Sequence, residues 1–128
     1  MPGFIHIDIA ADDPQRAADF YAKVFGWRIQ KLEGPMPYWL VATDAPAGGG
    51  SALGAGIAQR TQPWQSATPT IDVPSADDYA GKITAAGGTI VVPKVLIPGV
   101  GYLVTFKDTE GNVFAVLEAV EGNPFGGD

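Results

Sequence analysis

The sequence has no cysteine and only one histidine, His6, among its 128 residues. The lack of cysteine excludes disulfide bonds, thiolate nucleophiles and zinc sites built on thiolates, and it is compatible with a reducing cytoplasm. Long apolar runs are also missing, and the first residues lead directly into a strand pattern, so we expect neither a secretory leader nor a membrane span. We therefore expect a soluble, cytoplasmic protein.

Basic residues are scarce as well. The chain has 8 lysines and arginines against 14 aspartates and glutamates, which gives a formal net charge of -6. A nucleic-acid partner would need a basic surface for the phosphate backbone, so we expect no nucleic-acid binding. The length suits one domain that buries a hydrophobic core without the help of disulfide bonds or structural metals.

The opening of the chain carries the clearest pattern. Over residues 4–9, isoleucines alternate with polar residues, and this period of two predicts a half-buried strand. His6 and Asp8 then share the face opposite the isoleucines. Polar side chains on that face indicate a wet cleft.

A helix follows this strand. Asp13 is placed to cap its first amides, Pro14 suits the first helical position, and Gly26 provides a stop. Three further strands are predicted before a linker over residues 60–68. Their ranges are 27–32, 38–43 and 53–59.

The same order then returns. Ile71-Asp72-Val73 repeats Ile7-Asp8-Ile9, and a helix capped by Ser75 follows it. Strands are predicted at 89–92, 102–106 and 113–118. We therefore predict an α+β fold of two βαβββ modules, about 3–60 and 68–120, which pair into one cupped mixed sheet within a single domain, followed by a short tail over 121–128.

This repeat, with the closing motif FKDTEGNVFAVLE over residues 106–118, resembles the vicinal oxygen chelate superfamily of glyoxalases, bleomycin-resistance proteins and extradiol dioxygenases. The resemblance covers about residues 4–120. It implies a glyoxalase-like fold, and it also implies a divalent metal, such as zinc, nickel, iron or manganese, in the members that use one. Such folds often pair as homodimers, which we expect here.

The resemblance places His6 and Glu118 at two positions of the family's metal site, where they would serve as metal ligands and catalytic residues. Thr70 stands where a second histidine is expected, and Ala58 or Gln59 stands where a carboxylate is expected. Two protein ligands are fewer than the three usual in a catalytic site. Other side chains or a partner subunit would have to complete the set; the candidates within the chain are Gln59, Asp8 and Asp72.

The departures favour a protein that binds a small organic molecule in the cupped sheet around an incomplete metal site. The candidate ligand-binding residues are Trp39, Tyr102, Phe106, Asp8, Asp72 and Gln59. One alternative is a metal-dependent lyase, isomerase or dioxygenase that acts on vicinal oxygens through His6 and Glu118. Another is metal-free acid–base chemistry at His6, oriented by Asp8.

Overall fold

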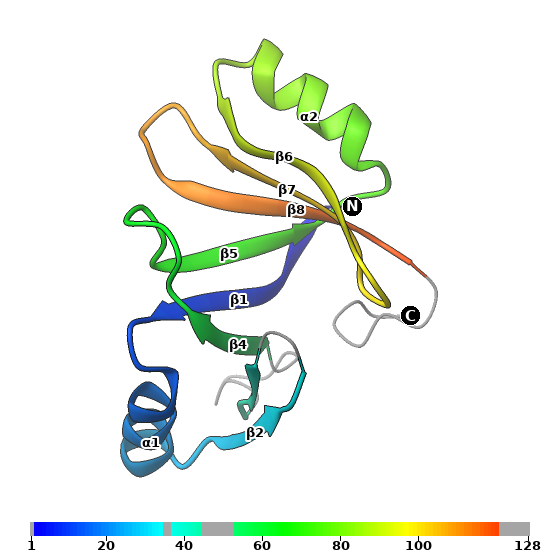
Figure 1. Ribbon diagram of the computed structural model, residues 1–128. Helices are drawn as coiled ribbons and strands as arrows, with labels where there is room; N and C mark the ends of the chain where they lie inside the picture. Colours follow the sequence, from blue (N-terminus) through cyan, green and yellow to red (C-terminus); the bar gives the residue numbers. More distant parts are fainter. Residues whose placement is uncertain (1, 35–36, 45–52, 121–128) are drawn as a thin grey trace. The chain divides into compact units, whose positions relative to one another are not determined.

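A computed structural model of the chain describes residues 2–34, 37–44 and 53–120, so the predicted tail lies outside the described residues. Figure 1 shows the elements of this part of the chain. They are β1 (Gly3–Ala11), α1 (Pro14–Phe25), β2 (Arg28–Leu32), β3 (Tyr38–Ala42), β4 (Gly54–Gln59), β5 (Ala67–Asp72), α2 (Ala76–Ala85), β6 (Thr89–Ile97), β7 (Gly101–Lys107) and β8 (Val113–Ala119). The predicted α+β class is therefore confirmed.

The contacts divide the chain into two units. The N-terminal unit comprises residues 6–68, and the C-terminal unit comprises residues 1–5 and 69–128. In the described residues, no helix is long and apolar enough to cross a membrane.

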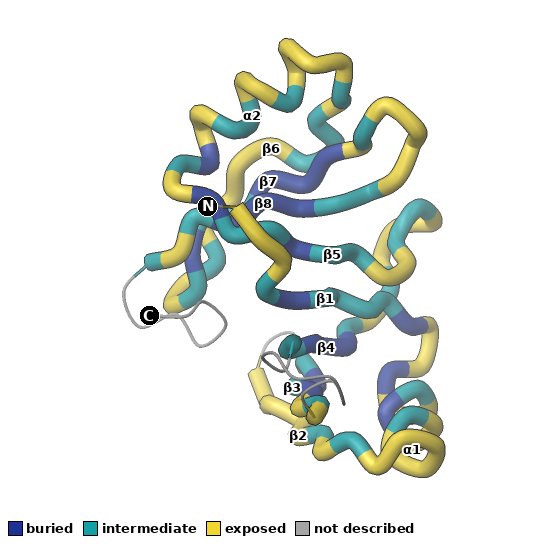
Figure 2. The backbone as a smooth tube through the Cα atoms, turned by 180° about the vertical axis from the view of Figure 1, so that it is seen from behind, coloured by how far each residue is buried: buried dark blue, intermediate teal, exposed yellow. Residues whose placement is uncertain are grey.

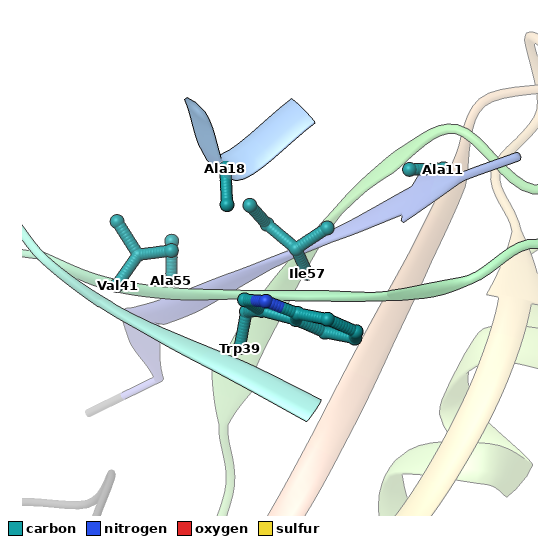
Figure 3. Packing of buried hydrophobic residues seen from close by; sticks show 6 residues of the cluster. All are labelled: Ala11, Ala18, Trp39, Val41, Ala55 and Ile57. Carbon is teal, nitrogen blue, oxygen red and sulfur yellow. The ribbon is translucent and has the colours of Figure 1, made fainter. Parts of the chain in front are cut away.

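The N-terminal unit is a four-stranded mixed sheet with α1 on one face (Figure 1). Its strand order is β2-β3-β4-β1, with β1 parallel to β4 and the other neighbours antiparallel. Ala18 of α1 packs with Val41 and Ile57 in the core between helix and sheet (Figure 3). The buried members of this core are Ala11, Ala18, Trp39, Val41, Ala55 and Ile57.

The ends of α1 form as the sequence predicts. The side chain of Asp13 accepts a hydrogen bond from the amide of Arg16 at 3.1 Å, and Pro14 begins the helix. Gly26 adopts φ 71° and donates its amide to the carbonyl of Ala22, so a residue without a Cβ ends the helix where a left-handed conformation is required.

The C-terminal unit repeats this arrangement. Its strand order is β5-β8-β7-β6, with β5 parallel to β8 and the other neighbours antiparallel. The side chain of Ser75 caps α2 by accepting from the amide of Asp78 at 3.1 Å. Figure 2 shows that both helices are exposed over much of their length, while buried residues concentrate in the strands. The buried core beneath α2 consists of Val73, Ala76, Val104, Phe106 and Val116.

Two predicted strand boundaries are wrong, both near prolines. β6 was expected to end before Pro93, but it continues to Ile97. It is the outer strand in the order of its unit, and Pro93 lies within the register shift between Val92 and Val95, so the missing amide interrupts no regular ladder. β5 begins at Ala67, inside the predicted linker, and its pairing with β8 starts at Thr70, after Pro69.

The strand registers assign each side chain to a face. In the N-terminal unit, His6 pairs with Gly54 and Asp8 with Gly56, while Tyr38 pairs with Ala58. Paired residues point to the same side of a sheet, so these side chains lie on the face opposite α1. We call this face, with His6, Asp8, Tyr38 and Leu40, the His6 face.

Candidate functional site

Three polar side chains of the N-terminal unit form a hydrogen-bonded triangle on the His6 face. His6 Nε2 lies 2.9 Å from Asp8 Oδ1 and 2.8 Å from the hydroxyl oxygen of Tyr38. The Tyr38 hydroxyl in turn donates to Asp8 Oδ1 at 2.9 Å. The sequence predicted the pairing of His6 with Asp8, but it gave no role to Tyr38.

Local structure explains how these groups meet. His6 and Asp8 are two residues apart on β1, so strand alternation places both on one side. Tyr38 belongs to β3, which β4 separates from β1, and its ring crosses β4 at Gly56. A Cβ at Gly56 would lie 1.5 Å from the Tyr38 hydroxyl oxygen, so only glycine leaves room for this path.

The environment fixes the proton of Tyr38. Burial raises the pKa of its hydroxyl far above the ordinary value of 10.0, and the charge of Asp8 and the hydrogen bond to Asp8 raise this pKa further. The phenol therefore remains protonated and acts as a donor to the carboxylate. Its oxygen is then left to accept from His6 Nε2, which indicates that this ring nitrogen carries a proton.

The exposure of the triangle is uneven. The His6 side chain is 5% exposed, whereas the Asp8 side chain is 44% exposed. His6 therefore lies behind the carboxylate, and His6 and Tyr38 together hold one of its oxygens. This order reverses the predicted one, in which Asp8 orients a reactive His6.

Two other predicted ligand-binding residues of this unit lie away from the triangle. Trp39 is buried on the α1 side of the sheet (Figure 3). Its indole N–H donates to Gln15 Oε1 at 3.1 Å. Gln59 is exposed at the end of β4 and donates its side-chain amide to the carbonyl of Asp12 at 3.0 Å. Both side chains are thus engaged in the structure of their unit.

The predicted residues of the C-terminal unit divide between its two faces. Tyr102 and Phe106 pack in the core on the α2 side. Glu118 pairs with Tyr102, and its Oε1 accepts from the amide of Ala76 in the first turn of α2 at 2.9 Å. Glu118 therefore serves as a cap for α2.

Asp72 lies on the face opposite α2, together with Thr70. Asp72 pairs with Leu117, and Thr70 pairs with Ala115, which also pairs with Thr105. Thr70 and Thr105 are both buried, and Thr70 Oγ1 has no hydrogen-bond partner among the described residues. His6 and Thr70 thus hold equivalent positions in the two halves of the repeat, but the second position carries a hydroxyl instead of an imidazole.

The donor set does not fit the metal site that the family resemblance implies. The carboxylate of Glu118 faces α2 and caps it, and His6 Nε2 is hydrogen-bonded to Asp8 and Tyr38. Within either unit, the described residues contain no group of three or more His, Cys, Asp or Glu that could hold a metal ion. We therefore derive no chemical step through a metal.

A cavity of about 420 Å³ lies elsewhere in the N-terminal unit, beside the first turns of α1. Arg60 lines it, but its guanidinium donates to Asp12 Oδ1 at 2.9 Å and to the carbonyl oxygens of Gln65 and Ala10. The guanidinium of Arg60 is thus already hydrogen-bonded to residues of its own unit. None of the triangle residues lines the cavity. The candidate site is therefore the triangle.

Comparison with solved structures finds similar folds. A variant of the Streptomyces coelicolor methylmalonyl-CoA epimerase in complex with 2-nitronate-propionyl-CoA matches with TM-score 0.68 and 13% identity over 93% of this chain and 95% of that chain. The Mycobacterium tuberculosis methylmalonyl-CoA epimerase matches with TM-score 0.62 and 13% identity over 92% and 88%. A hypothetical protein from Bacillus halodurans matches with TM-score 0.69 and 11% identity over 94% and 96%. At these identities the likeness is one of fold.

A search of the curated proteins found no match. The family model described as the Glyoxalase/Bleomycin resistance protein/Dioxygenase superfamily, by contrast, matches residues 3–116. This match confirms the resemblance drawn from the repeat and the closing motif. The chain belongs to the Glyoxalase/Bleomycin resistance protein/Dioxygenase superfamily.

Proposed function

We propose that this protein binds a small organic molecule on the His6 face of its N-terminal unit. The observation that carries the proposal is the triangle of His6, Asp8 and Tyr38, in which every distance lies between 2.8 and 2.9 Å. Polar groups removed from water are costly unless they are hydrogen-bonded, so a fixed polar cluster on a sheet face is a common form of recognition site.

The surroundings of the triangle suit a small ligand. Leu40 pairs with Gly56, which pairs with Asp8, and Gly54 pairs with His6. The Tyr38 ring takes the space above Gly56. Leu40 is partly exposed on the same face and offers a bound molecule an apolar contact. Trp39, Tyr102, Phe106 and Glu118 are left out of the proposed site because they support the helix-side cores and the cap of α2.

A second candidate function is proton transfer without a metal. Asp8 is a partly exposed carboxylate, and the imidazole of His6 contacts it directly. Such a pair can remove a proton from a bound molecule and return it, with His6 and Tyr38 stabilising the charge on Asp8. The epimerases of similar fold make methylmalonyl-CoA a reasonable compound for the first turnover assay.

The proposal also includes the assembly. We expect the two βαβββ modules, about 3–60 and 68–120, to act as one domain in a cytoplasmic homodimer. Phe20, Val24 and Phe25 are each more than half exposed on α1 and offer apolar surface for a contact. Light scattering at micromolar concentration should give twice the monomer mass.

One experiment tests the proposed function. A collection of small molecules is screened against isotope-labelled protein by amide NMR, with and without divalent metals, and every hit is assayed for turnover. We expect hits that shift the amides of Asp8, Leu40 and Gly56 and that do not require metal. A hit whose turnover needs metal and disappears in both His6→Ala and Glu118→Ala would instead establish the metal-dependent alternative.

A further inference from the structure

The two carboxylate oxygens of Asp8 have different surroundings. Both hydrogen bonds that described residues make to this side chain, from Tyr38 and from His6, reach Oδ1. The side chain is 44% exposed, and its second oxygen takes no bond from a described residue. Oδ2 is therefore the group of the triangle that is placed to meet a ligand.

Both donors of the triangle lie at one oxygen of Asp8. Tyr38 keeps its proton and donates it to Oδ1, and the single Nε2–H of His6 lies within hydrogen-bond distance of both Oδ1 and the Tyr38 oxygen. A carboxylate with two donors on one oxygen is fixed in orientation and remains an acceptor at the other.

Among the described residues, His6 is the one basic side chain that pairs with Asp8. On the His6 face, β3 presents Tyr38, Leu40 and Ala42, and β4 presents only glycine and alanine. Arg28 of β2 lies on this face, but its Nη1 is 3.8 Å from Asp44 Oδ1. No lysine or arginine of the described residues forms an ion pair with Asp8.

These observations identify the chemical class of the ligand. We propose that Asp8 is the residue that contacts the ligand, and that the ligand is a small amine whose protonated nitrogen donates to Oδ2 while its apolar body lies over Leu40. His6 and Tyr38 are positioning residues that hold Oδ1. This inference rests on the proposed function, because it assumes that small molecules bind the His6 face.

Three compounds with the same aromatic body and different head groups test it on the unaltered protein. Phenethylamine is cationic, phenethyl alcohol is neutral and phenylacetate is anionic. Amide NMR titrations should give a dissociation constant for the amine that is on the order of tenfold lower than for the alcohol, the factor expected for one charge-assisted hydrogen bond. The shifted amides should include Asp8, Leu40 and Gly56, and phenylacetate should leave them unchanged.

Matched variants separate the contact from its support. Asp8→Asn should abolish the preference for the amine over the alcohol. Asp19→Asn removes one negative charge from an exposed position on α1 and should leave the preference intact. Tyr38→Phe should weaken binding of both compounds while the ratio of their affinities stays above one, because Oδ2 keeps its charge.

The outcomes distinguish this inference from the proposed function. If the alcohol or phenylacetate binds the His6 face as tightly as the amine, the inference is overturned and the binding site stands. If the amine binds with an unchanged preference in Asp8→Asn, Asp8 is not the contact. If no compound of a broad collection shifts the amides of this face, the proposed function is wrong and the inference falls with it.

Discussion

At the scale of single residues, the contact with Tyr38 changes the role that we assign to His6. Without Tyr38, His6 and Asp8 would form a pair in which an imidazole does the chemistry and a carboxylate orients it. With Tyr38, a second donor reaches Asp8 Oδ1, and the His6 side chain is less accessible than the carboxylate. The acceptor, rather than the histidine, is then the exposed end of the cluster.

The glycines of β4 allow a direct test of this cluster. A methyl group at Gly56 would lie 1.5 Å from the Tyr38 oxygen, whereas one at Gly54 would lie at an ordinary 3.7 Å from His6 Nδ1. Gly56→Ala should therefore displace Tyr38 and lower the free energy of unfolding by about 1–3 kcal/mol, as overpacking usually does. Gly54→Ala is the matched control and should cost less. Urea denaturation measures both, and equal losses would contradict the proposed path of the tyrosine.

The raised pKa of Tyr38 predicts a pH dependence of stability. In the unfolded chain tyrosine releases its proton near its ordinary pKa of 10.0, whereas in the folded protein the pKa is higher. The contribution is present below pH 10 and is lost as the pH rises further, because only the unfolded state gains from ionisation. The free energy of unfolding should fall more steeply above pH 10 in the wild type than in Tyr38→Phe. Parallel curves for the two proteins would show that the hydroxyl is not buried against Asp8.

At the scale of elements, the cap of α2 explains why Glu118 ends its strand. Its carboxylate accepts from the amide of Ala76, where a helix leaves amides unsatisfied and favours negative charge. Glu118→Ala should lower the free energy of unfolding by about 0.5–2 kcal/mol, the usual loss for a helix cap. Glu118→Gln keeps an acceptor and should lose less.

The exposed Glu110 supplies the control for this prediction. Among the described residues, its side chain accepts a hydrogen bond only from its neighbour Thr109, so Glu110→Ala should change stability little. Thermal unfolding followed by circular dichroism compares the three variants. Loss of bound metal in Glu118→Ala without loss of stability would contradict the capping role.

The sequence predicted the helices and strands better than it predicted which face of each sheet a side chain occupies. The caps at Asp13 and Ser75 and the stop at Gly26 were predictable because each acts through bonds to residues a few positions away. Trp39 and Tyr102 lie on strands that carry large apolar or aromatic residues on both faces, so alternation alone could not say which face the helix covers. The contact between Tyr38 and His6 joins residues 32 positions apart and depends on a gap at Gly56, which no local pattern records.

At the scale of the whole molecule, the two halves of the repeat share a fold but carry different polar side chains. Asp8 and Asp72 lie on the helix-free faces of their units, as the recurrence of Ile-Asp predicts. The residue two positions earlier is His6 in one unit and Thr70 in the other, and Ala115 pairs with Thr70 on that face. The second half therefore offers a hydroxyl group where the first offers an imidazole, while both halves keep an aspartate.

This asymmetry leads to a prediction about metal. Catalytic metal sites usually use three protein ligands, and the carboxylate that the sequence nominated, Glu118, is committed to α2. Protein purified without chelator should contain less than about a tenth of an equivalent of zinc, nickel, iron or manganese, and chelation should not alter its unfolding temperature, because no folding free energy is linked to a metal. Elemental analysis and thermal unfolding with added metals measure this. The contrary result would be a stoichiometric metal that is lost in His6→Ala but retained in the exposed control Glu110→Ala. It would show that ligands from elsewhere complete the metal site and that the protein is a metal-dependent member of its superfamily.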